Sequence, residues 1–182
     1  MKNQQAMQRL LATVPLFQGL SPEELLLFLS HCRQQEIADQ VVVVREGEHG
    51  RHLYAVMSGK LQVQRRGQAG ETVELATLSA GDVFGELALI DFGERSASVV
   101  SSEPCRLLGF DRLDMVKLPA ELAAKLYRNV GTLMAERLRR SNSLVTVLLA
   151  QRELPVLQDK AEAAEADGNG YSMPKQRVVI RR

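Results

Sequence analysis

The segment FGELALIDFGERSASVV, residues 84–100, carries the two side chains whose types and spacing best suit chemistry. Glu86 directly follows Gly85, and Arg95 comes nine residues later, among mostly small and apolar residues. Residues 85–88 are expected to begin a helical turn, whose free N–H groups favour an anion. Gly85 would let a ligand approach the backbone closely. The forked guanidinium of Arg95 can bind the same anion, while Glu86 accepts hydrogen bonds from hydroxyl groups.

An anion, adjacent hydroxyl groups and apolar walls together describe a nucleotide, so this segment is a candidate nucleotide site. A second interpretation stays open, in which Glu86 and Arg95 pair with each other as a structural salt bridge. No catalytic group and no metal site is indicated, because His31, His49 and His52 make no metal-ligand pattern with cysteine or acid. A phosphodiesterase would need such a metal-binding cluster. We therefore expect a binding protein and not an enzyme.

Short strands, separated by turns that contain glycine, are expected on both sides of this segment and must position it. The turn signals EGEHG, SG, GQAG, SAGD and DFGE separate them. Strands so short and closely spaced predict an antiparallel jelly-roll β-barrel, and the expected fold class is α+β, mainly β. The expected strands cover residues 41–44, 52–58, 60–66, 73–78, 96–102 and 105–110.

Helices are expected before and after the strands. A short helix covers residues 4–13, and a second begins at Ser21, where Glu24 completes a capping box. A long helix follows the strands, and its apolar residues step by four and three, which is typical of a coiled-coil seam. We expect this seam to form a homodimer; packing on the chain's own barrel is the alternative. The seam consists of Met134, Leu138, Ser141, Val145 and Leu148.

The chain therefore divides into four expected parts. Residues 1–36 form N-terminal helices, residues 37–117 the β-roll, residues 118–154 the long helix, and residues 155–182 a mobile tail with an acidic half and a basic end.

Two motifs resemble those of cyclic-nucleotide-binding domains. The segment 84–100 looks like the family's phosphate-binding cassette, with a hydrophobe before Gly-Glu and then Arg-Ser-Ala. The segment VVREGEHGRHLYAVMSG, residues 43–59, is similar to the family's glycine-spaced strand and turn, with Gly47, Gly50 and Gly59 in register. The resemblance covers roughly residues 16–150, and ERSA at 94–97 is especially similar to catabolite activator protein-like regulators.

The resemblance implies a role for each cassette residue. Glu86 matches the family acid that binds the ribose 2′-hydroxyl, and Arg95 matches the arginine that binds the cyclic phosphate. Ser96 and the backbone N–H groups near Gly85, Leu87 and Ala88 would assist Arg95. The implied cassette site thus comprises Phe84, Gly85, Glu86, Leu87, Ala88, Arg95, Ser96 and Ala97.

Four further residues are implied at the base. Aligning the long helices places Ser141 and Asn142 where the family's adjacent hydroxyl residues contact the adenine, one of them across the dimer. Asparagine both donates and accepts hydrogen bonds, so the choice between cAMP and cGMP stays open. Val63 and Leu75 fall at strand positions that would wall the base, with a plain core role as the alternative.

The resemblance implies a receptor without a cofactor, with cAMP as its ligand and cGMP as the alternative ligand. The family's catabolite activators continue into a helix-turn-helix domain, for which residues 155–182 leave too little room, so no direct DNA binding is expected. We expect a stand-alone receptor that shifts its long helix to regulate an unknown effector protein. The alternative is an adaptor of the same fold that binds a cyclic dinucleotide or nothing. A third hypothesis makes MPKQRVVIRR, residues 173–182, a docking peptide for nucleic acid or a partner.

The composition, with 45% hydrophobic and 25% charged residues, is typical of a soluble globular protein, and we expect this protein in the cytoplasm. The formal net charge is +1, so no global field favours nucleic acid or a membrane surface. The sequence has no apolar run of about 20 residues and no signal-peptide core. Its two cysteines, Cys32 and Cys105, are far apart, and a disulfide framework is not expected.

Overall fold

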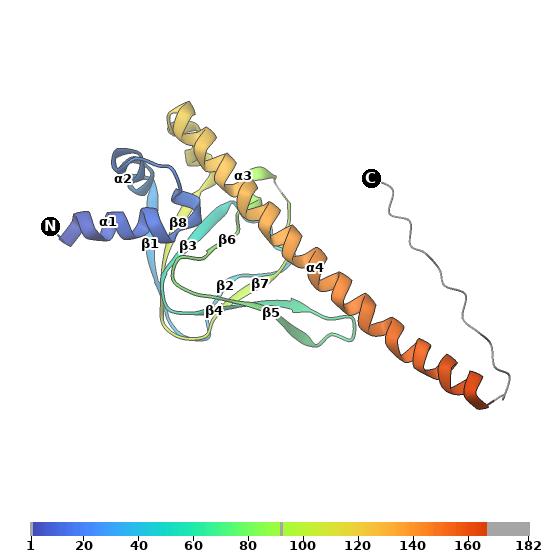
Figure 1. Ribbon diagram of the computed structural model, residues 1–182. Helices are drawn as coiled ribbons and strands as arrows, with labels where there is room; N and C mark the ends of the chain where they lie inside the picture. The colour runs from blue at the N-terminus through green and yellow to red at the C-terminus, as the bar shows by residue number, and fades with distance from the viewer. Residues whose placement is uncertain (1, 92, 167–182) are drawn as a thin grey trace, which may run out of the picture. The chain divides into compact units, whose positions relative to one another are not determined.

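A computed structural model describes residues 2–91 and 93–166 (Figure 1). Short helices precede two antiparallel sheets and one long helix follows them, which confirms the expected fold class. The elements are α1 (Lys2–Thr13), the 3-10 helix η1 (Pro15–Phe17), α2 (Pro22–Ser30), β1 (Cys32–Ile37), β2 (Val42–Val44), β3 (His52–Ser58), β4 (Leu61–Arg66), β5 (Thr72–Leu78), β6 (Val83–Phe84), α3 (Leu87–Ile90), β7 (Ser98–Ser101), β8 (Cys105–Asp111), the 3-10 helix η2 (Arg112–Lys117) and α4 (Ala120–Ala166).

The strands form two four-stranded sheets, in the orders β1-β8-β3-β6 and β2-β7-β4-β5. All the strand pairs within them are antiparallel. Within the described residues no ladder joins the two sheets, so the roll is open where we expected a closed barrel.

Two apolar clusters hold the layers together. Strand β3 contributes side chains to both clusters, because its side chains alternate between its two faces. Leu53 belongs to the cluster that joins β3 and β8 to the helices, where Phe28 stacks on Phe110 with ring centroids 4.7 Å apart. Val56 belongs to the second cluster, which lies between the sheets and includes Leu107. A strand with both faces buried gives the roll a rigid centre.

Three sequence predictions need correction. Residues 32–36 were expected to belong to the N-terminal helical part, but together with Ile37 they form β1, a polar edge strand paired along its whole length with β8. Strand β6 has only two residues and was not expected. The long helix was expected to end before Pro155, but α4 continues to Ala166. Its added part, 156–166, is rich in Ala, Glu, Leu, Gln and Lys, which favour helices. The rest of the expected tail, 167–182, lies outside the described residues.

The chain divides into two compact units, the first ending at Ala135 and the second beginning at Glu136. In the second unit the predicted seam residues are open to solvent: Leu138 is 62% exposed, Val145 51% and Leu148 62%. Among the described residues, no helix is both long enough and apolar enough to cross a membrane.

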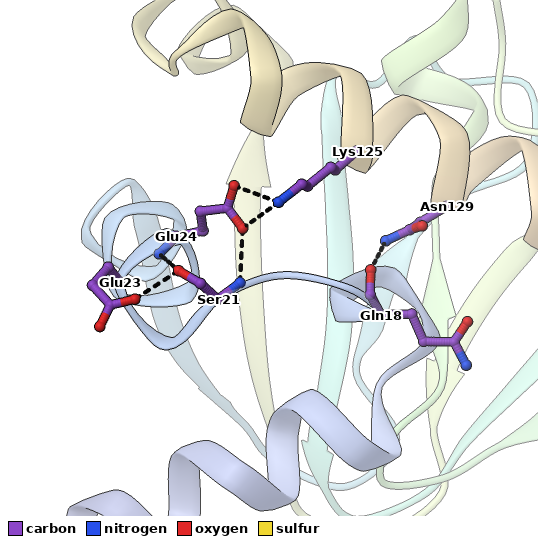
Figure 2. A network of polar contacts seen from close by, with 6 residues as sticks. All are labelled: Gln18, Ser21, Glu23, Glu24, Lys125 and Asn129. Carbon is purple, nitrogen blue, oxygen red and sulfur yellow. Dashed lines mark hydrogen bonds and ion pairs between the residues drawn. The ribbon is translucent and has the colours of Figure 1, made fainter.

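A polar network fastens the first part of α4 to the N-terminal helices (Figure 2). The predicted capping box is present, because the Glu24 N–H donates to Ser21 Oγ and Glu24 Oε2 accepts from the Ser21 N–H at 2.7 Å. The Lys125 ammonium donates to both oxygens of Glu24, at 2.7 and 2.8 Å. Asn129 is buried, and its amide nitrogen donates to the carbonyls of Leu16 and Gln18, both at 2.8 Å.

Replacing Asn129 with alanine is expected to lower the free energy of unfolding by about 1–3 kcal/mol. The reason is that the carbonyl of Leu16, which the amide reaches in a buried position, would lose its donor. Urea titration followed by circular dichroism measures the change. Thr132→Ala, at an exposed position one turn further along α4, is the matched control and should leave stability almost unchanged. Equal stability of the two variants would show that the Asn129 bonds contribute nothing.

Candidate functional site

The predicted cassette connects one sheet to the other. The chain leaves β6, turns at Gly85, forms the single helical turn α3 and reaches β7 in the second sheet. Gly85 has a φ of +74°, and a β-carbon there would lie 2.6 Å from Nη1 of Arg95 and 2.8 Å from the His52 carbonyl oxygen. Only glycine fits both this conformation and this contact. The helical turn expected near Gly85 is thus confirmed.

The guanidinium of Arg95 is held by backbone carbonyls. Nη2 donates to the His52 carbonyl at 2.8 Å, and Nη1 donates to the Gly85 carbonyl at 3.3 Å. Among the described residues Arg95 forms no salt bridge, so a structural ion pair with Glu86, which the sequence also permitted, does not hold its guanidinium. Burial lowers the pKa of Arg95 below its usual range, while the charges of Tyr54 and Glu86 oppose this shift. Arginine nevertheless stays protonated at neutral pH, so the cassette contains a half-buried cation.

The glycine motif and the cassette meet at Arg95. The Gly47 N–H donates to the Arg95 carbonyl and the Arg95 N–H donates to the Glu48 carbonyl, both at 2.9 Å. Gly50 lies directly against the arginine side chain, where a β-carbon would overlap Nε and come within 2.5 Å of Cζ and Nη2. The loop at residues 47–50 therefore fixes both the backbone and the guanidinium of Arg95. The sequence showed the two motifs but not this contact.

Glu86 is 6% exposed and stands at the N-cap of α3. Its carbonyl accepts from the Leu89 N–H at 3.0 Å, and the Gly85 carbonyl accepts from the Ala88 N–H at 3.1 Å. The Ala88 N–H thus already has a partner within the turn, whereas the first N–H groups of a helix have none inside it. The N–H group of Leu87 is therefore better placed for an anion than that of Ala88.

Sequence reasoning missed Tyr54 as part of this site. Its ring stacks on that of Phe84 with centroids 5.0 Å apart, and the ring of His52 stacks on it with centroids 6.0 Å apart. Burial raises the pKa of Tyr54, and the charge of Arg95 opposes the shift. Gly109 on β8 leaves space for this ring, because a β-carbon there would come within 3.1 Å of it. In the sequence Tyr54 is an aromatic residue inside a predicted strand, and this pattern indicates only that it packs in the core.

The other predicted cassette residues differ in the exposure of their side chains. Phe84 and Ala88 are buried at 4% exposed each, while Leu87 is 36% exposed. Ser96 is exposed and Ala97 partly buried.

The four residues predicted at the base differ in their exposure. Val63 is partly buried and packs against the core between the sheets, which fits a core role as well as a wall. Leu75 is 56% exposed, so it is not a core residue in this structure. Ser141 and Asn142 are exposed on α4 in the second unit. For all four residues, contact with a base stays a prediction.

No group of three or more metal-ligating side chains occurs among residues 4–91 and 93–150, whose side chains the structure describes. Both cysteines are free thiols, and burial raises the pKa of Cys32 to about 12. The site is therefore built from one cation, one carboxylate, backbone N–H groups and apolar walls.

Comparison with known proteins agrees with this geometry. A family model described as the cyclic nucleotide-binding domain matches residues 34–121. The cyclic AMP receptor protein of Thermus thermophilus is 39% identical over 70% of this chain and 59% of its own length. The CRP-like cAMP-activated global transcriptional regulator of Mycobacterium tuberculosis is 30% identical over 79% of this chain and 63% of its own. The chain thus spans about three fifths of the length of these relatives.

Solved structures give the same result. The crystal structure of Thermus thermophilus catabolite activator protein is 38% identical with a TM-score of 0.68, over 74% of this chain and 62% of that one. The regulatory domain of Toxoplasma gondii PKA, crystallised with cAMP, is 29% identical with a TM-score of 0.59, over 68% of this chain and 47% of that one. Residues 34–121 of the chain are therefore a cyclic nucleotide-binding domain, as their resemblance to that family predicted.

Proposed function

We propose that this protein is a receptor for a cyclic nucleotide, with cAMP as the preferred ligand. The observation that carries the proposal is the half-buried Arg95 guanidinium, which two carbonyls and the glycine loop hold in place and which forms no salt bridge with another described residue. A cation fixed in this way is available to an anionic ligand. The names of its relatives, a cyclic AMP receptor protein and a PKA regulatory domain crystallised with cAMP, support cAMP as that anion.

Each cassette group then has a role toward the ligand. The Arg95 fork and the Ser96 hydroxyl bind the cyclic phosphate, helped by the N–H groups at the start of α3. The buried Glu86 carboxylate accepts a hydrogen bond from the ribose 2′-hydroxyl. These two side chains hold opposite ends of one ligand, which explains why a short apolar segment keeps both charges.

The base is proposed to contact residues outside the cassette. Val63 and Leu75 form the apolar wall beside the base, and Ser141 and Asn142 bind its polar edge. An asparagine amide can serve either purine because it both donates and accepts. Binding of cGMP as well as cAMP is therefore part of the proposal.

The output is proposed to run through α4. The exposed apolar seam that includes Leu138, Val145 and Leu148 suits a second copy of the chain, because such a stripe is normally covered in a coiled coil. Ligand binding would shift the equilibrium between two positions of this helix and change what it presents to an effector protein in the cytoplasm.

A thermal-shift series tests the ligand. Saturating cAMP is expected to raise the melting temperature by several degrees, because a ligand at 100 times its dissociation constant adds about 2.7 kcal/mol to the stability. cGMP should give a smaller shift, and cyclic dinucleotides none. If no nucleotide shifts the transition, the adaptor of the same fold becomes the better hypothesis. If a cyclic dinucleotide alone raises the melting temperature, the ligand is that dinucleotide and not cAMP.

A further inference from the structure

A polar hollow of about 390 Å³ lies at one end of the sheet β2-β7-β4-β5. Four segments line it: the loop after β2, the end of β4, the start of β5 and the start of β7. Neither Glu86 nor Arg95 is among its lining residues. We call it the arginine hollow, after its lining by Arg45, Arg65 and Arg66, together with Glu46, Gln64, Thr72 and Ser98.

Glu46 ties three of these segments together. Its backbone N–H donates to Ser98 Oγ at 3.0 Å. Its Oε1 accepts from Arg65 Nε at 3.3 Å, and its Oε2 accepts from the Arg66 N–H at 2.9 Å. The carboxylate is thus engaged at both oxygens, and it links the loop after β2 to the end of β4.

The remaining groups on the lining leave an excess of positive charge. Three guanidinium groups face one carboxylate, Glu46. Arg45 pairs with Glu48 at 3.4 Å, but both side chains are more than 60% exposed, so this pair is weak. Within the described residues the side chain of Arg66 forms no salt bridge. Excess charge in a concave surface concentrates the potential there and attracts an anion.

The same lining offers hydrogen-bond donors. Guanidinium groups bind phosphate oxygens through two parallel N–H groups. The Ser98 hydroxyl accepts from Glu46 and still carries a hydrogen that it can donate, and Thr72 provides a second hydroxyl. The volume falls at the small end of the range for sites that take small molecules.

We propose that the arginine hollow is a second ligand site, for a small molecule that carries a phosphate or pyrophosphate group. It shares no residue with the pair Glu86 and Arg95, so it stands whether or not the cassette binds a cyclic nucleotide. Such a site would let the protein respond to a second, multiply charged phosphate compound.

Calorimetric titration of the full chain with pyrophosphate at physiological ionic strength tests this site. The double variant Arg45→Gln/Arg66→Gln is expected to bind about tenfold more weakly or worse, because charge-assisted hydrogen bonds are lost. Both positions are exposed, so the fold should survive, which circular dichroism checks. Arg106→Gln, an exposed arginine on β8 in the other sheet, is the matched control and should bind as the wild type does. Arg95→Gln should also keep pyrophosphate binding.

Each other outcome overturns the proposal. The site does not exist if the wild type binds no pyrophosphate, or if the double variant binds it with unchanged affinity. Equal weakening by Arg106→Gln would show attraction to general surface charge, and loss in Arg95→Gln would place pyrophosphate in the cassette. A parallel titration with a short DNA duplex tests whether the hollow binds nucleic acid instead. If the protein binds DNA but not pyrophosphate, the hollow is not a small-molecule site.

Discussion

Replacing Arg95 with alanine is expected to abolish cAMP binding at micromolar concentrations while the protein stays folded. Removing one partner of a desolvated charge pair costs roughly 2–5 kcal/mol, or about 30-fold to several thousand-fold in affinity. Stability should change far less, because Arg95 is only half-buried and water can reach the carbonyls of His52 and Gly85 in its place. Isothermal calorimetry measures the affinity, and circular dichroism measures the fold.

The matched control is Arg106→Ala, which removes an exposed arginine whose Nε donates to Ser58 Oγ. This variant should bind cAMP like the wild type. If Arg95→Ala and the wild type bind with equal affinity, the assignment of the phosphate to Arg95 is wrong. If Arg95→Ala unfolds, Arg95→Lys keeps the charge but loses the fork, and it should still bind much more weakly.

Replacing Gly50 with alanine is expected to weaken cAMP binding at least about tenfold without direct contact to the ligand. The added methyl group would occupy the position of the Arg95 guanidinium. Because that guanidinium is the far end of a flexible side chain, it can swing away at little cost to the fold. Swinging away, however, breaks its bonds to the carbonyls of His52 and Gly85 and takes the charge from the phosphate.

Gly131→Ala is the matched control for this second prediction. Gly131 lies in α4, a β-carbon there would meet nothing within 4 Å, and alanine is the better helix former. It should bind cAMP normally and unfold at a slightly higher temperature. Normal cAMP affinity in Gly50→Ala would mean that the glycine loop does not position Arg95 for the ligand.

The sequence was sufficient where local chemistry decides the structure. The capping box of Ser21 and Glu24, the turn after Gly85 and the bounds of β3 all appear as expected. Each depends on residues within a few positions of one another, so their spacing carries the information. The family resemblance rested on two such local motifs, and the match over residues 34–121 confirms it.

The sequence was insufficient where distant segments decide the structure. Strand β1 is polar, and it exists because β8 offers an edge for pairing. The two residues of β6 likewise depend on pairing with β3. The roles of Gly50 and Tyr54 follow from their neighbours Arg95 and Phe84 across the roll, which no local pattern reveals. Helix α4 passes Pro155, because the helix-forming residues beyond it outweigh a single proline.

The most direct test of the central claim is a crystal structure of the protein grown with cAMP. We expect the cyclic phosphate within hydrogen-bond distance of the Arg95 guanidinium and the ribose 2′-hydroxyl on the Glu86 carboxylate, with the base beside Val63 and Leu75. Electron density for the nucleotide at another position, such as the arginine hollow, or an empty cassette at saturating cAMP, would contradict the proposed function.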